Sequence, residues 1–119
     1  MNIVIAALSA PCQLNGVSRH GVNLVSALLS TNKITNIHYL SGCWQREMFE
    51  SVLPRDDERL HTHWIELREA NFHRLIWYLR EFPEIARQLE ADVVHLTYPA
   101  PISRGAFSCP TVVSLHERQ

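Results

Sequence analysis

The sequence predicts an α/β fold in which helices cover both faces of a parallel β-sheet. Segments of strand length alternate along the chain with segments whose apolar residues recur at helical spacing. The first strand segment, Asn2 to Leu8, is continuously apolar, which is typical of a strand covered on both faces. Because crossovers between parallel strands are right-handed, we expect a doubly wound, Rossmann-like sheet with the strand order 3-2-1-4-5.

Strands are expected at residues 2–8, 34–40, 60–67, 92–98 and 110–116. The first helix is expected over residues 17–29 and a shorter one over 44–53. A third helix begins at Asn71 and carries an apolar set that comprises Phe72, Leu75, Ile76, Leu79 and Phe82. Pro83 is expected either to kink that helix or to start a new one from its first position.

Length and composition indicate one globular domain over residues 1–119, with 46% hydrophobic and 19% charged residues. The formal net charge of −1 gives no electrostatic reason to expect nucleic acid or an anionic membrane as a partner. The first residues lack the basic region of a signal peptide, and no segment approaches the roughly 20 apolar residues of a membrane span. The three cysteines, Cys12, Cys43 and Cys109, form no C-x-x-C pair. A cytoplasmic localisation is therefore expected.

Because parallel strands all end at one edge of their sheet, residues that follow strands should meet there although they are scattered in the sequence. The residues expected at this rim are Gly16, Ser41, Gly42, Arg68, Pro99 and His116. Ligands of such sheets bind at the switch point, here between the first and fourth strands.

Gly16 ends the first strand-to-helix loop, where a helix N-terminus presents unpaired N–H groups suited to a phosphate. The sequence QLNGV is neither a G-x-G-x-x-G motif nor a P-loop. From the residues alone, two interpretations stay open: a phosphate contact, or a structural turn in which Asn15 or Gly16 caps the helix.

Three polar residues near the rim have both a functional and a plain interpretation. His116 is positioned to donate a hydrogen bond or move a proton, or is an exposed residue after a strand. Arg19 could reach an anionic acceptor across the rim. His20, beside it, fits either the cleft or a solvated helix face.

The remaining histidines considered give weaker evidence of a functional site. His61 and His63 form an H-x-H pair that could in principle bind zinc, but no third ligand is obvious, so no metal site is expected. His38 and His95 lie within strands and are interpreted as structural. No carboxylate pair has the spacing of an acid/base dyad, and no Ser/His/Asp arrangement can be placed.

The aromatic pair Trp77 and Tyr78, with Arg74 and Arg80, is open to two interpretations. The helix could rest on a membrane or a partner, or it could place its aromatic side chains in the core with charged residues on the surface. The acidic residues that follow favour the second interpretation, so peripheral membrane contact is not indicated.

Taken together, three blocks resemble the N-terminal domain of a family 4 (group 1) glycosyltransferase of GT-B fold. They are NIVIAAL with NGVSRHGVNLVSALL (Asn2 to Leu29), ADVVHLTYPAP (Ala91 to Pro101) and PTVVSLHE (Pro110 to Glu117). The resemblance covers nearly the whole chain.

The resemblance implies roles for individual residues. Gly16 is similar to the second glycine of the family's G-G-V loop, whose backbone approaches the donor diphosphate, and Asn15 replaces the first glycine. His116 resembles the family's histidine that faces the transferred sugar, which implies a catalytic role. Arg19 and His20 match polar positions that face the cleft, which implies contact with the acceptor.

The implied activity is that of a retaining, hexosyltransferase-like glycosyltransferase without a metal or other cofactor. The implied partners are a nucleotide-sugar donor and a sugar, lipid or small-molecule acceptor. In the family most donor contacts come from a C-terminal domain, so these 119 residues are expected to be a truncated, acceptor-side half with little or no activity alone. Two alternatives remain: a stand-alone flavodoxin-like module that binds a small ligand at the same rim, and a partner-binding domain built around the helix of Trp77.

Overall fold

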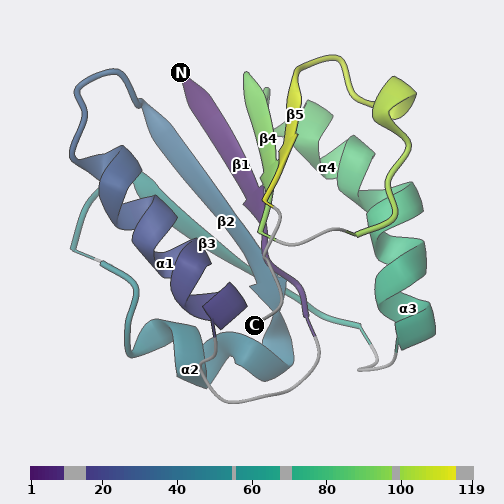
Figure 1. Cartoon of the computed structure of the whole chain (residues 1–119), viewed down its shortest axis with the longest axis horizontal. Coiled ribbons are helices and arrows are strands. Elements are labelled where there is room, and N and C mark those ends of the chain that lie inside the picture. The colour runs from purple at the N-terminus through teal and green to yellow at the C-terminus, as the bar shows by residue number, and fades with distance from the viewer. Residues whose placement is uncertain (10–15, 55, 68–70, 98–99, 115–119) are drawn as a thin grey trace.

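Five parallel strands form one sheet in the order β3-β2-β1-β4-β5, which confirms the predicted fold class and strand order (Figure 1). The computed structural model of the chain describes residues 1–9, 16–54, 56–67, 71–97 and 100–114. The strands are β1 (Asn2–Ala6), β2 (Asn36–Gly42), β3 (Leu60–Ile65), β4 (Val93–Leu96) and β5 (Thr111–Val113). The helices are α1 (Gly16–Leu29), η1 (Cys43–Gln45), α2 (Arg46–Glu50), α3 (Asn71–Ile76), η2 (Trp77–Glu81), α4 (Phe82–Gln88) and η3 (Arg104–Ala106).

The register of the central strands determines which side chains share a face. Ile5 of β1 pairs with Tyr39 of β2 and with His95 of β4. Partners in register point to the same side of a sheet, so these three side chains lie on one face. Ile5 and Tyr39 belong to the core under α1, so His95 lies on the α1 side as well.

Two hydrophobic cores lie on opposite faces of the sheet. The first packs the sheet against α1 and α2 and contains Ile5, Val25 and Phe49. The second packs it against η2 and α4 and includes Val4 and Trp77. Figure 1 shows α1 on one side of the strands and α3 with α4 on the other. Burial on both faces explains why β1 is apolar throughout.

The third helical segment runs from α3 through η2 into α4, with a π-helical turn ahead of Pro83. The Phe82 N–H bonds to the carbonyl oxygen of Trp77, five residues earlier. α4 begins at Phe82 with Pro83 directly after it, close to the predicted new helix. A proline has no N–H to donate, and the wider turn before it accommodates this without ending the helix.

The face of this segment that packs on the sheet differs from the predicted apolar set. Trp77 and Tyr78 are each only 1% exposed, whereas Phe72, Leu75 and Leu79 are 65%, 40% and 42% exposed. Two aromatic rings remove more apolar surface from water than two leucines would. The interpretation of Trp77 and Tyr78 as core residues is confirmed, and a docking surface made by their side chains is excluded.

Gly21 allows α1 to lie close to the sheet. A Cβ atom at this position would lie 2.6 Å from the hydroxyl oxygen of Tyr39 and 3.2 Å from Cγ2 of Thr97. The Tyr39 hydroxyl is buried and has no hydrogen-bond partner among the described residues. Burial also raises the pKa of Tyr39. The first half of α1 is thereby held against the carboxyl half of the sheet.

Candidate functional site

The carboxyl edge of the sheet carries the candidate site. α1 begins at Gly16, and Figure 1 shows this end of the helix near the carboxyl ends of the strands. Ser41 and Gly42 end β2 at the same edge, as predicted. The other rim residues, Asn15, Arg68, Pro99 and His116, lie outside the described residues, so the roles predicted for Asn15 and His116 stay predictions.

Three polar side chains from three elements meet on the α1 side of this edge. Nε2 of His20, in α1, lies 2.7 Å from the Ser114 hydroxyl oxygen, directly after β5. Nε2 of His95, in β4, lies 2.7 Å from the same oxygen. The two imidazole centroids are 6.3 Å apart. We call His20, His95 and Ser114 the rim triad.

The hydrogen bonds within the rim triad limit which of its atoms can carry a proton. One hydroxyl has a single hydrogen, so Ser114 can donate to only one of the two imidazoles, and at least one ring must donate an N–H to Ser114. Burial, and then the nearby His20, lower the pKa of His95, so that imidazole is neutral at neutral pH. An arrangement of this kind can hold a hydrogen-bonding substrate group in one orientation and can pass a proton through the hydroxyl.

Of the two predicted acceptor residues, the structure places His20 in the rim triad, half-buried, and Arg19 in an exposed position on α1. Ser114 and the role of His95 were missed by the sequence interpretation. A signal was present: His95 pairs with Val112 in register, so Ser114, two residues further on, lies on the same face. To predict the contact with His20, however, one also had to know where β5 ends and how α1 lies across the sheet.

A second polar cluster holds Ser9, the last described residue of the chain before α1. Oε1 of Gln45 accepts from the Ser9 N–H at 3.3 Å, and Nε2 of Gln45 donates to the Ser9 hydroxyl at 2.8 Å. The Trp44 indole N–H donates to the Ser9 carbonyl oxygen at 2.8 Å. The Tyr78 hydroxyl donates to the carbonyl oxygen of Leu8 at 2.8 Å. We call Ser9, Trp44 and Gln45 the Ser9 clamp.

Gln45 also ties this clamp to the end of β2. Its Oε1 accepts from the Ser41 hydroxyl and from the Gly42 N–H, each at 3.0 Å. Gly42 itself lies under the ring of Trp44, where a Cβ would come within 2.4 Å of the indole. The clamp therefore fixes Ser9 against the end of β2.

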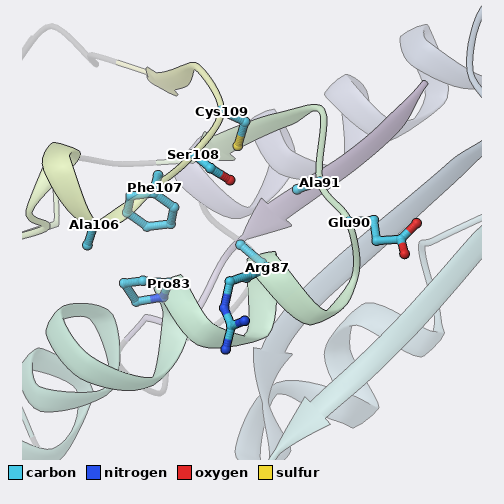
Figure 2. A pocket seen from close by; sticks show the side chains of 9 residues that line it. Pro83, Arg87, Glu90, Ala91, Ala106, Phe107, Ser108 and Cys109 are labelled. Carbon is cyan, nitrogen blue, oxygen red and sulfur yellow. The ribbon is translucent and has the colours of Figure 1, made fainter.

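One hollow lies beside the Ser9 clamp and a second lies away from it, next to α4. An open one of about 540 Å³ is bordered by η1 and α2, with Trp44 and Arg46 among its lining residues. A smaller pocket of about 90 Å³ lies between α4 and the segment before β5 (Figure 2). Cys109 lines that pocket, and burial, followed by the charge of Asp92, raises the pKa of its thiol. A protonated thiol is a poor nucleophile, so the smaller pocket offers no reactive group of that kind.

The predicted H-x-H pair lies next to a third histidine. His61 and His63 of β3 lie beside His38 of β2, on the face opposite to α1. Among the described residues, no three His, Cys, Asp or Glu side chains are already arranged around a common metal position.

No family model, curated protein or solved structure matches this chain. Within the described part of the chain, no helix has both the length and the apolar character needed to cross a membrane.

Proposed function

We propose that this chain is the N-terminal, acceptor-side domain of a retaining GT-B glycosyltransferase that transfers a sugar from a nucleotide-diphosphate donor. The observation that carries the proposal is the convergence of His20, His95 and Ser114 beside the β1/β4 switch point. Doubly wound sheets bind their ligands at this point. The sequence resemblance of the same segments to glycosyltransferases supports the proposed chemistry.

The proposal assigns separate tasks to the two ends of the site. At Gly16 the first N–H groups of α1 would face the donor diphosphate, where the helix dipole favours negative charge. Absence of a side chain at this residue would let the backbone approach the phosphate oxygens. The departing diphosphate would be stabilised there as the glycosidic bond to the donor breaks.

The rim triad would orient the acceptor. His20 would bind the incoming hydroxyl group, while Ser114 fixes the tautomer and the ring plane of His20. The half-buried His95, whose pKa is lowered, would hold Ser114 from the other side. His116, two residues after Ser114, keeps its proposed contact with the transferred sugar.

The test is sugar transfer by the complete gene product with a panel of nucleotide sugars, because donor contacts are proposed to come mainly from a domain beyond this one. Gly16→Val should lower kcat/KM about tenfold to a hundredfold by blocking approach to the diphosphate. His116→Ala should lower kcat about tenfold or more without unfolding the domain. The anomeric configuration of the product should match that of the donor.

A matched control is Gly105→Val, because a Cβ at Gly105 would meet nothing within 4 Å. This variant should transfer sugar as the unmodified protein does. Transfer that is unchanged in both Gly16→Val and His116→Ala would remove the assigned roles. Tight binding of a small ligand by the 119 residues alone, with no transfer from any nucleotide sugar, would favour the flavodoxin-like module instead.

A further inference from the structure

Three imidazoles are in contact on the face of the sheet opposite to α1. His38 and His61 are partners in register on β2 and β3, and their rings stack with centroids 4.9 Å apart. His63, two residues after His61, lies on the same face, with its ring centroid 5.2 Å from that of His38. This cluster is separate from the rim triad, which lies on the other face.

Two ring nitrogens in the cluster point at each other. Nδ1 of His38 and Nε2 of His63 are 3.0 Å apart and share a hydrogen bond. Burial, and then the neighbouring His63 and His61, lower the pKa of His38 to about 4, and burial also lowers that of His63. The hydrogen bond requires that one of the two facing nitrogens carries a proton and the other a lone pair.

The two nitrogens are close enough to share one ion. Imidazole nitrogens bind first-row metal ions at about 2.0–2.1 Å, so nitrogens less than about 4 Å apart can both reach it. In the hydrogen bond the N–H and the lone pair lie along the line between the nitrogens, so both rings must turn to direct lone pairs at an ion beside that line. Among divalent first-row ions, Cu²⁺ binds imidazole nitrogen most tightly.

We propose that His38 and His63 chelate a divalent transition-metal ion, Cu²⁺ in preference to Zn²⁺. The imidazole that now donates in their hydrogen bond takes its other tautomer, so both nitrogens present lone pairs to the ion. Water fills the remaining coordination positions. His61 stacks on His38, and its Nε2 lies 2.9 Å from Oδ1 of Asn36, so it is not counted as a ligand.

The site links two neighbouring strands, one of which, β3, is the edge of the sheet. The two nitrogens come together only when β2 and β3 are paired, so the ion binds the folded chain and stabilises it by mass action. The proposal does not depend on the proposed glycosyltransferase activity, since it concerns other residues on the other face.

The test is titration of the metal-free chain with Cu²⁺ and with Zn²⁺, followed by calorimetry and by the nitrogen hyperfine structure of the Cu²⁺ electron paramagnetic resonance spectrum. One equivalent of Cu²⁺ should bind, with at least two coupled imidazole nitrogens and an affinity at least about tenfold above that for Zn²⁺. The unfolding temperature should rise by several degrees on addition of Cu²⁺.

His38→Gln and His63→Gln should each abolish the saturable binding, whereas His61→Gln, which removes no ligand, should retain it. His73→Gln, in α3, is the matched control and should bind as the unmodified chain does. If a variant fails to fold, Cu²⁺-induced broadening of nuclear magnetic resonance signals in the unmodified chain locates the ion, and it should be strongest around His38 and His63 in β2 and β3. Unsaturable binding, unchanged binding in His38→Gln, or tighter binding of Zn²⁺ than of Cu²⁺ would overturn the proposal.

Discussion

The Gln45 side chain binds Ser9 through both of its polar atoms, accepting from the Ser9 N–H at 3.3 Å and donating to the Ser9 hydroxyl at 2.8 Å. Gln45 is 2% exposed, so each of these bonds is sheltered from water. Ser9 follows β1 and precedes the segment that leads to Gly16. A buried amide in η1 thus anchors Ser9, at the carboxyl end of β1.

Replacement of this amide by a similar apolar side chain should be costly. In Gln45→Leu, the Ser9 and Gly42 N–H groups and the Ser41 hydroxyl lose their shared acceptor. Buried donors left without a partner cost about 1–3 kcal/mol each, so three of them predict a loss of at least about 3 kcal/mol in the free energy of unfolding, measured with urea. The amide protons of Ser9 and Gly42 should also exchange faster with solvent.

Gln88→Leu supplies the control, because Gln88 is exposed on α4. Its free energy of unfolding should change by less than about 0.5 kcal/mol. Unchanged exchange at Ser9 in Gln45→Leu would mean that the clamp does not hold Ser9.

The contact between Gly21 and Tyr39 can be tested by a double-mutant cycle. Gly21→Ala places a Cβ 2.6 Å from the Tyr39 hydroxyl oxygen, so overpacking should outweigh the gain in helix propensity and destabilise the protein by about 1–2 kcal/mol. Tyr39→Phe removes a hydroxyl that is buried without a partner among the described residues, and should leave stability unchanged or raise it by about 1 kcal/mol.

In the double variant the alanine methyl group occupies the space that the hydroxyl leaves. We expect the two changes to be coupled by about 1 kcal/mol or more, measured by urea unfolding of all four proteins. Additive effects would show that α1 moves away from the sheet instead of pressing on the hydroxyl.

The helix of Trp77 should respond to mutation on one face only. Trp77→Ala removes a side chain that is 1% exposed and should cost about 3–5 kcal/mol of stability. Phe72→Ala, at 65% exposure, should cost less than about 1 kcal/mol. Thermal unfolding of the two variants measures both losses of stability. A larger loss in Phe72→Ala than in Trp77→Ala would show that the helix packs on the sheet through the apolar set predicted from helical spacing.

Stability should fall as the solution is made mildly acidic. Burial lowers the pKa of His95, and it lowers that of His38 to about 4, whereas an unfolded histidine titrates near pH 6.5. Below about pH 6.5 the unfolded chain therefore binds more protons than the folded one, so the free energy of unfolding falls until the folded pKa values are passed. Well above pH 6.5 both forms are neutral, so neither group contributes a slope.

Urea unfolding with a metal chelator present, between pH 7.5 and 4.5, measures this dependence. His38→Gln should flatten the curve between about pH 6.5 and 4, where only its unfolded form titrates. A stability that rises towards pH 5 in the unmodified protein would contradict the lowered pKa values.

The fold was predictable because its signals are local. Continuous apolar strands such as β1 and the helical spacing of α1 follow from short segments, and right-handed crossovers then determine the strand order. The site was predictable only as an edge of the sheet. Gly16 and His20 could be assigned to that edge, whereas Ser114 appeared to be an ordinary strand residue.

The sequence by itself determined the alternation of strands and helices, the doubly wound sheet and the edge at which a ligand would bind, because each depends on periodicity and on general rules of connection. Only the tertiary structure decided that Ser114 joins His20 to His95, that His38 joins His63, and that Phe72, Leu75 and Leu79 stay exposed beside the buried Trp77. These contacts depend on strand register, on the close approach of α1 at Gly21 and on the packing of large rings. Such interactions link residues far apart in the chain, and no local pattern records them.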